Sequence, residues 1–340
     1  VVISDLIRGD VSFNTGLIDD KVLLKADGMP TYHLAVVVDD YLMKISHAFR
    51  GEEWLPSAPV HVLLWRYLFG EENMPQWAHL PLILKPDGNG KLSKRDGDRL
   101  GFPVFAMDWK DPGSGEVFKG FRERGFLPQA FINMLALLGW NDGTGKEIFS
   151  LNELIDAFTM DRVHKGGAKF DYEKAKWFNH EWIKQMPAST YGDLVKELFL
   201  EKGILISDQD QYEKILALVK DRCTLLTDFY EQSKFFFEAP SQWDMNSVKP
   251  KWNPEKKSFF EAFATQMESL PSLDPNSIES NFKQLAGEKN IKPGELQLPF
   301  RIMLVGEKKG PPVFEIASLL GKPETVNRIQ HFLKAISAQN

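Results

Sequence analysis

Two lysines, a serine and an arginine follow a hydrophobic run in the first third of the chain. The run Leu80–Leu84 predicts a buried strand, and a Pro-Asp-Gly-Asn-Gly loop follows it. Turn-forming residues ahead of a basic cluster favour a mobile loop that can approach phosphate. Lysine acts on phosphate as a point charge, so Lys91 and Lys94 can follow charge that moves during a reaction, while Ser93 and Arg95 add further donors. The alternative is a solvated surface loop, because short motifs often match by chance.

An arginine stands at the end of a second expected strand. Ile45–Phe49 alternates as a strand does, and Arg50 follows it directly. A planar guanidinium can bind a carboxylate through two parallel hydrogen bonds, which lysine cannot do. The alternative is a surface ion pair of Arg50 with Asp39 or Asp40. Ligands in open α/β folds gather beyond the carboxyl ends of strands, so one cleft could hold both Arg50 and the basic loop.

The composition is that of a globular protein with two or more domains. The chain has 340 residues, of which 43% are hydrophobic and 26% charged. A net charge of −6 argues weakly against nucleic-acid binding, but the lysines and arginines are clustered, and local basic patches can contact RNA. The single Cys223 excludes a disulfide framework and a cysteine-based zinc site, and it suits a reducing compartment. We expect no membrane partner, because the apolar runs are too short to cross a bilayer.

The elements that must position these residues begin with short strands. Residues 1–30 predict two or three antiparallel strands, at Val1–Ser4, Val11–Phe13 and Lys21–Lys25. Pro59–Phe69 predicts a helix, with proline at its start and glycine beyond its end. Residues 97–120 are rich in Gly, Pro and Asp, and we expect an insertion of surface loop with a little strand and no assigned function.

Helices dominate the rest of the sequence. Leu127–Gly139 predicts one helix, and Ser150 with Glu153 forms a capping box that opens another. Val163–Phe170 is a glycine-rich basic loop, either a linker or a contact site. Further helices are expected at Asp171–Gln185, Tyr191–Lys202, Asp210–Glu231, Pro254–Met267, Asn276–Gly287, Gly294–Val305, Val313–Leu320 and Thr325–Ser337, with a break into two bundles at Pro240–Pro254.

Several of these stretches together resemble one enzyme family. KLSKR at residues 91–95 resembles the KMSKS signature of class I aminoacyl-tRNA synthetases. Gly28–Asp40 and Ile45–Trp54 resemble the glutamate-site strands of the glutamyl-tRNA synthetases. Three downstream stretches, Phe126–Trp140, Phe170–Ile183 and Leu298–Gly306, resemble that family in the same order. The resemblance covers essentially the whole chain.

The resemblance implies a fold that is α/β plus all-α. Residues 1–30 would end the acceptor-binding insert, and residues 31–84 would form the second half of the Rossmann-like catalytic domain. Residues 85–170 would hold the KMSKS loop and a stem-contact domain. Residues 171–340 would be an all-helical anticodon-binding domain of two bundles, as in bacterial-type enzymes, which breaks near 240–254. We expect a cytoplasmic monomer.

The implied reaction is the ATP-dependent activation of glutamate to glutamyl-adenylate and its transfer to the 3′ end of tRNA(Glu). Catalysis would rest on positioning and phosphate charge, with Mg²⁺ entering as a complex with ATP and with no zinc bound to this chain. The roles implied are as follows: catalytic Lys91, Ser93 and Lys94; glutamate-binding Tyr32 and Arg50; ATP-binding Glu53, Trp54, Leu82, Ile83, Lys94 and Arg95; and tRNA-binding Lys165 and Lys169. Tyr32 is alternatively a packed core aromatic.

None of the seven histidines belongs to an H-x-G-H motif, the second signature of class I synthetases. The resemblance therefore predicts a chain that lacks its N-terminal part and is inactive alone. Three other functions stay open: a non-catalytic tRNA-binding module, a glutamyl enzyme that also charges tRNA(Gln), and an unrelated nucleotidyl-transfer enzyme. The helical C-terminal region argues against the last, because that reaction alone has no use for it.

Overall fold

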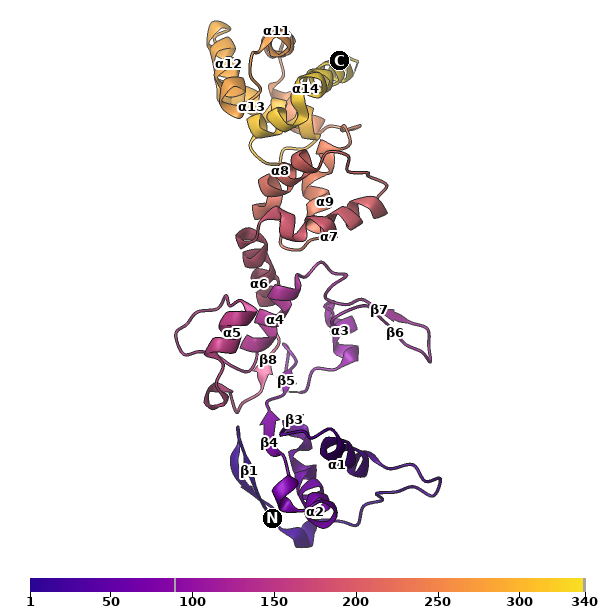
Figure 1. The fold of residues 1–340 in the computed structure, drawn as a ribbon. Helices are drawn as coiled ribbons and strands as arrows, with labels where there is room; N and C mark the ends of the chain where they lie inside the picture. The colour runs from indigo at the N-terminus through magenta and orange to yellow at the C-terminus, as the bar shows by residue number, and fades with distance from the viewer. Residues whose placement is uncertain (89, 339–340) are drawn as a thin grey trace. The chain divides into compact units, whose positions relative to one another are not determined.

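The computed structural model describes residues 1–88 and 90–338 (Figure 1). The N-terminal part of the chain forms a four-stranded sheet. Its order is β2-β1-β4-β3. The strands are β1 (Val2–Asp5), β2 (Gly9–Ser12), β3 (His47–Gly51) and β4 (Gln76–Leu80). β1 and β2 are antiparallel, whereas β1 and β3 each run parallel to β4. The carboxyl ends of β1, β3 and β4 therefore meet at one edge of the sheet.

Two helices pack against this sheet. They are α1 (Tyr32–Leu42) and α2 (Ala58–Leu68), and α2 begins with proline in its first turn as expected. Their shared core with the sheet is aliphatic and aromatic, and it includes Ile3, Val37, Ala48, Trp65 and Trp77. The expected helix at Pro59–Phe69 and the expected strand at Ile45–Phe49 are confirmed to within two residues, so both elements leading to Arg50 and the basic loop are present.

The prediction of one buried strand at Leu80–Leu84 is wrong. β4 ends at Leu80, and a separate two-residue strand, β5 (Ile83–Leu84), begins after Pro81. Proline has no N–H to give to a ladder, so the run breaks there. Leu80 and Ile83 are 38% and 39% exposed. The break directs the chain out of the sheet toward the basic loop.

Two other strand predictions near the N-terminus are also wrong. Gly28–Asp40, interpreted as a glutamate-site strand, contains most of helix α1, because the apolar side chains recurring along it pack against α2 and the sheet. Lys21–Lys25 forms no strand, only an isolated bridge between Leu24 and Pro30. The strands at Val1–Ser4 and Val11–Phe13 are observed as β1 and β2.

The rest of the chain up to Asn179 contains a second, small sheet. β5 pairs in parallel with β8 (Ala168–Lys169), so the end of the basic loop Val163–Phe170 is fixed against the chain that follows β4. The segment 97–120 contains the expected short strands as a hairpin, and it also holds most of a helix that the sequence did not reveal. Between β5 and β8 the chain forms α3 (Lys94–Leu100), β6 (Trp109–Lys110), β7 (Val117–Phe118), α4 (Pro128–Leu137) and α5 (Leu151–Ala157).

All regular secondary structure in the described residues of the second unit is helical. The chain divides into units Val1–Asn179 and His180–Asn340, and α6 (Tyr172–Gln185) runs through the division. The helices that follow are α7 (Ala188–Glu201), α8 (Gln209–Val219), α9 (Asp228–Ser233), α10 (Met245–Val248), α11 (Pro254–Ser269), α12 (Pro275–Glu288), α13 (Pro293–Val305) and α14 (Val313–Ser337). Phenylalanines from α11 to α14 interdigitate in one core: Phe259, Phe260, Phe263, Phe282, Phe300, Phe314 and Phe332.

One helix prediction in this unit is wrong, and a predicted pair of helices is observed as one kinked helix. Asp210–Glu231 is not one helix, because a 3-10 turn and a bend separate α8 from α9 around Cys223. The two helices expected at Val313–Leu320 and Thr325–Ser337 are observed as the arms of α14. They meet at Gly321, whose φ of 80° is a left-handed conformation that glycine adopts without strain.

A buried arginine ties the second unit together. Arg328 on α14 is 2% exposed, and its Nη1 donates to the carbonyl oxygens of Phe235 at 2.6 Å and Leu304 at 2.5 Å. Its Nε pairs with Glu324 at 2.6 Å. One side chain therefore links α14 to the ends of two other segments.

We expect Arg328→Met to lower the free energy of unfolding of the second unit by about 2–4 kcal/mol, because two buried carbonyls lose their donor. The matched control is Lys283→Met on α12, whose exposed i,i+4 pair with Glu279 should be worth about 0.5 kcal/mol or less. Urea unfolding followed by hydrogen exchange of peptides from this unit measures both. Equal effects of the two substitutions would contradict the stabilising role of Arg328.

We expect Gly167→Ala to disturb the β5–β8 pairing while Gly166→Ala does not. A Cβ on Gly167 would lie 2.9 Å from Leu84 Cδ1 and 3.1 Å from the Leu82 carbonyl oxygen, whereas a Cβ on Gly166 meets nothing within 4 Å. The first change should cost about 1–3 kcal/mol, the usual range for overpacking. Faster hydrogen exchange at residues 82–84 in the Gly167 variant alone checks this, and equal exchange in both variants contradicts it.

Candidate active site

The residues expected to bind glutamate lie on α1 and β3. Tyr32 opens α1 and is 42% exposed, so it is not a packed core aromatic. Its ring centroid lies 4.5 Å from that of Trp54, at a tilt of 36°. Together the two rings form an accessible aromatic surface at the amino end of α1.

Arg50 already has a carboxylate partner. Its Nη2 pairs with Asp40 at 2.8 Å, and its Nη1 donates to the Phe49 carbonyl at 3.0 Å. The ion pair left open from the sequence is therefore observed. Burial raises the pKa of Asp40, and the Arg50 charge partly opposes that rise. The buried Nε of Arg50 has no partner among the described residues and remains a donor.

Two histidines, His33 and His61, pack against the ring of Tyr32. His33 Nδ1 lies 3.0 Å from His61 Nε2, and the His61 ring also makes an edge contact with Tyr32 at 6.0 Å between centroids. His61 is 2% exposed. Burial, with the nearby His33 and Arg50 charges, lowers the pKa of His61 to about 4, so it is neutral at pH 7.

A cleft of about 270 Å³ brings several of the expected ATP-site residues together. Glu53, Leu82, Ile83 and Lys91 all line it, with apolar side chains from α4 on the other side. Lys91 and Glu53 form an ion pair across the cleft, and the hydrogen bond from Lys91 holds the pKa of Glu53 below its usual range. Glu53 is therefore ionised at neutral pH.

Ser93 begins helix α3. Its N–H donates to the Asp96 carboxylate at 3.0 Å, and its hydroxyl bonds the same carboxylate, completing a capping box. The Ser93 hydroxyl and then Lys85, at 3.0 Å, lower the pKa of Asp96. Sequence reasoning missed Lys85 and Asp96, although Ser-x-x-Asp is a capping signal. The side chains of Lys94 and Arg95 lie outside the described residues, and their backbone opens α3.

The backbone near Leu82 is engaged within the chain. The Leu82 N–H donates to Glu52 at 3.2 Å, and the Leu82 carbonyl accepts from Ala168 at 3.0 Å. The Ile83 carbonyl accepts from Leu92 at 2.8 Å. A nucleotide base that bonds this backbone must share these groups or exchange partners with them.

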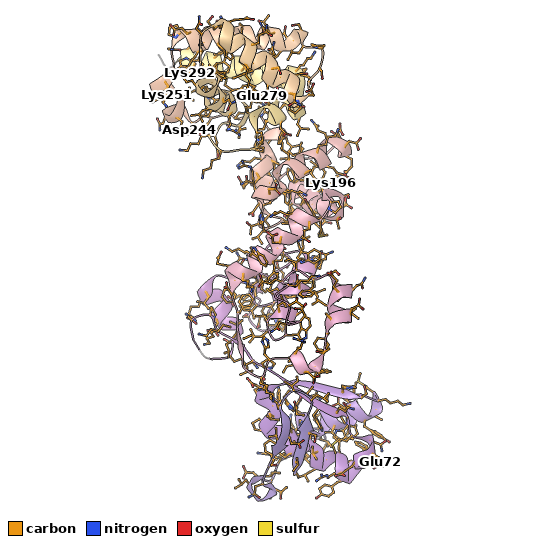
Figure 2. The ribbon with its side chains drawn as sticks, turned by 90° about the vertical axis from the view of Figure 1, so that its left-hand side faces the viewer. Glu72, Lys196, Asp244, Lys251, Glu279 and Lys292 are labelled. Carbon is orange, nitrogen blue, oxygen red and sulfur yellow. The ribbon has the colours of Figure 1, made fainter. Side chains whose placement is uncertain are left out.

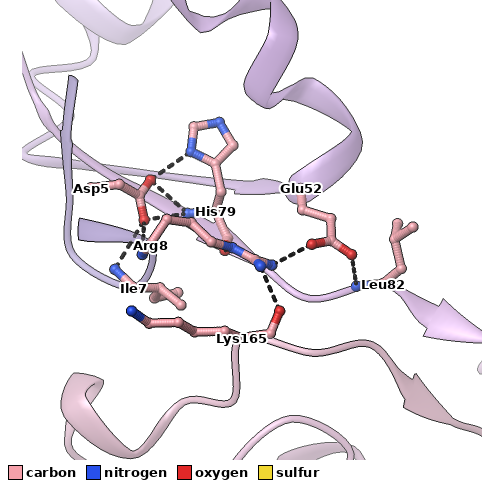
Figure 3. Close-up of polar contacts among 7 residues, drawn as sticks. All are labelled: Asp5, Ile7, Arg8, Glu52, His79, Leu82 and Lys165. Carbon is pink, nitrogen blue, oxygen red and sulfur yellow. Dashed lines mark hydrogen bonds and ion pairs between the residues drawn. The ribbon is translucent and has the colours of Figure 1, made fainter. Parts of the chain in front are cut away.

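A polar network that the sequence did not reveal surrounds this backbone (Figure 3). Asp5 accepts hydrogen bonds from the N–H groups of Ile7 and Arg8, at 2.9 and 2.8 Å, and from the His79 ring at 2.6 Å. Burial alone would raise the pKa of Asp5, but these hydrogen bonds outweigh it and lower the pKa. Asp5 and His79 are 74 residues apart. No local pattern signals such a pair.

The expected tRNA-contact residues lie on the loop that ends in β8. Lys165 and Lys169 are both exposed. The Lys165 carbonyl accepts from Arg8 Nη1 at 2.5 Å, so the loop is attached to the network around Asp5. The described residues contain no cluster of three metal-ligating side chains, and among them no helix is long and apolar enough to cross a membrane.

Side chains of both signs cover both units (Figure 2). The labelled lysines Lys196, Lys251 and Lys292 belong to the second unit, whose acidic side chains include Asp244 and Glu279.

Comparison with known proteins identifies relatives along the whole chain. A glutamate–tRNA ligase of Flavobacterium johnsoniae is 51% identical over 339 residues, which is 99% of this chain and 65% of the relative. One of Phocaeicola vulgatus is 48% identical over 99% of this chain and 66% of the relative. A crystal structure of a glutamate tRNA ligase from Elizabethkingia meningosepticum in complex with its amino acid has a TM-score of 0.90 at 44% identity, covering 98% of this chain and 66% of that one.

The chain thus spans about two thirds of the length of these relatives. Two family models account for it almost completely. The anticodon binding domain matches residues 173–333, which is the helical unit. The catalytic domain of class I tRNA synthetases (E and Q) matches residues 1–177, which hold the sheet, Arg50 and the KLSKR loop. The chain belongs to the class I tRNA synthetases of the glutamate and glutamine type.

Proposed function

We propose that this chain is the part of a glutamate–tRNA ligase that selects glutamate, contacts ATP and binds tRNA(Glu). One observation carries the proposal: Arg50 is the penultimate residue of β3, at the carboxyl edge of the sheet, and its Nε is a donor with no partner among the described residues. A carboxylate side chain is the ligand that such a donor suits best. The ligase names of the relatives from Flavobacterium johnsoniae and Phocaeicola vulgatus support it.

In the proposed reaction an oxygen of the glutamate α-carboxylate attacks the α-phosphorus of ATP, and pyrophosphate leaves. The glutamyl group then passes to the terminal adenosine of the tRNA. Lys91 and Lys94 offset charge on the phosphates, Ser93 sets the start of α3, and Arg95 adds a donor. Catalysis here is positioning and electrostatic stabilisation, since no side chain need become covalently attached.

Binding roles are assigned to the surrounding groups. Arg50 and Tyr32 hold glutamate; Trp54, Glu53 and the backbone of Leu82 and Ile83 border ATP. Mg²⁺ enters with ATP, held by phosphate oxygens and water. Lys165 and Lys169 contact the tRNA backbone. We also propose a monomer acting in the cytoplasm, which the single reduced cysteine, Cys223, suits.

A second candidate function is tRNA binding without catalysis. The match of residues 173–333 to an anticodon binding domain favours it for the chain by itself. Relaxed specificity for tRNA(Gln) is an outcome that the same experiments separate, because no described contact decides between the two tRNAs.

The protein to test is this chain extended to the length of its relatives with the remaining third of the Flavobacterium johnsoniae ligase. We expect it to catalyse ATP–pyrophosphate exchange with glutamate, and only when tRNA(Glu) is present. Each amino acid is tested with and without tRNA, and tRNA(Gln) serves as the specificity control. The 340-residue chain alone should bind tRNA(Glu) and fail in exchange. Exchange with glutamine, or tRNA binding without any exchange in the extended chain, would favour the alternatives.

We expect Arg50→Ala, in the extended chain, to raise the KM for glutamate by roughly 10²-fold, because a charged hydrogen-bonded partner is worth about 1.5–3 kcal/mol. The KM for ATP should change less than about threefold on the same argument. Arg66→Ala is the control: its arginine also pairs with a carboxylate, Glu71, but lies on the far half of α2. Unchanged glutamate KM in Arg50→Ala removes Arg50 from the proposed role.

A further inference from the structure

The backbone N–H and carbonyl of Leu82 are both linked by polar contacts to one loop. Its carbonyl accepts directly from Ala168, at 3.0 Å, and Ala168 belongs to the loop Val163–Phe170. Its N–H donates to Glu52, and Glu52 is ion-paired with Arg8 at 2.6 Å. Arg8 in turn donates to the Lys165 carbonyl of the same loop. The direct contact and the Arg8–Glu52 bridge therefore form a closed circuit around Leu82.

Arg8 is the junction of this circuit (Figure 3). Its Nε donates to the His79 carbonyl at 3.0 Å, its Nη1 to Lys165, and its Nη2 faces Glu52. The side chain is only 14% exposed, so these interactions are less screened than those of a surface ion pair. Asp5 accepts a hydrogen bond from the Arg8 N–H and so fixes the Arg8 backbone. The guanidinium therefore cannot shift toward one of its partners without weakening its contact with another.

The rigid fork of a guanidinium makes the contacts interdependent. Arg8 cannot track a displacement of the Lys165 carbonyl and keep its geometry to both His79 and Glu52. If Lys165 moves, the position of Glu52 changes, and with it the acceptor of the Leu82 N–H. Leu82 lines the cleft that also contains Lys91 and Glu53.

We propose that Arg8 and Glu52 are positioning residues that couple the loop Val163–Phe170 to the backbone of Leu82. Binding of a tRNA backbone at Lys165 and Lys169 then alters the nucleotide side of the cleft through Arg8 and Glu52. Coupling is reciprocal, so ATP in the cleft changes the affinity for tRNA by the same factor, which for typical two-site coupling is about 5–150-fold. This inference rests on the proposed roles of that loop and of Leu82.

The test is hydrogen exchange of peptides covering residues 80–86 in the 340-residue chain, with and without a tRNA(Glu) transcript. In the parent chain we expect tRNA to change exchange at Leu82. In Arg8→Met the change should be lost although tRNA still binds, because Lys165 and Lys169 remain. Arg8→Lys should not rescue it, since an ammonium cannot hold three divergent acceptors.

Glu52→Gln provides a second and milder variant. The amide oxygen still accepts from Leu82, so exchange without tRNA stays close to that of the parent, while the ionic link to Arg8 is gone. We expect the response to tRNA to be lost here too. Arg66→Met removes another ion-paired arginine of the same unit and should leave the response intact.

The outcomes separate the coupling from the proposed function. If the parent chain binds tRNA and exchange at residues 80–86 does not change, or if Glu52→Gln responds like the parent, the coupling is overturned and tRNA binding stands. If the parent chain does not bind tRNA, as judged by salt-dependent gel retardation, the proposed tRNA contact fails and the coupling fails with it.

Discussion

The buried contact between Asp5 and His79 is the constraint on which the site depends. It joins the end of β1 to the end of β4, and the Asp5 carboxylate also fixes the chain reversal at Ile7 and Arg8. A buried carboxylate persists only when donors surround it, and four N–H groups do so here. Because Arg8 leaves this turn at a fixed point, its guanidinium can meet Glu52 and Lys165 together.

Elements with local signals could be predicted from the sequence. The capping box at Ser150, the proline-led start of α2 and the apolar spacing of α11 to α13 each depend on residues within one turn or face. The failures had competing local signals. The β-branched run Val36–Val38 favours strand by propensity, yet packing against α2 decided for helix. The run Leu80–Leu84 is apolar throughout and therefore predicted one strand, but Pro81 has no N–H to donate, and the strand ends before it.

The site shows the same division between local and distant information. Arg50 and Lys91 were proposed from the sequence because each was expected to follow a strand. In the structure Arg50 is the penultimate residue of β3, and Lys91 follows β5 of the small second sheet. Arg8 and Glu52 were missed, because the partners that define them lie 157 and 30 residues away. Hydrogen bonds of that separation leave no periodicity. Only the three-dimensional structure reveals that a plain hairpin supplies the residue that links the loop to the cleft.

In the proposed function, Asp40 limits how far Arg50 alone can discriminate glutamate from glutamine. An arginine without a partner would lose a full charge interaction when an amide replaces the carboxylate. Arg50 keeps Asp40 in either case, at 2.8 Å, so its charge is never uncompensated. The penalty against glutamine is then smaller than for an isolated guanidinium. Selectivity in the proposed reaction must therefore be shared with Tyr32 and the histidines that support it, because one neutralised charge cannot supply all of it.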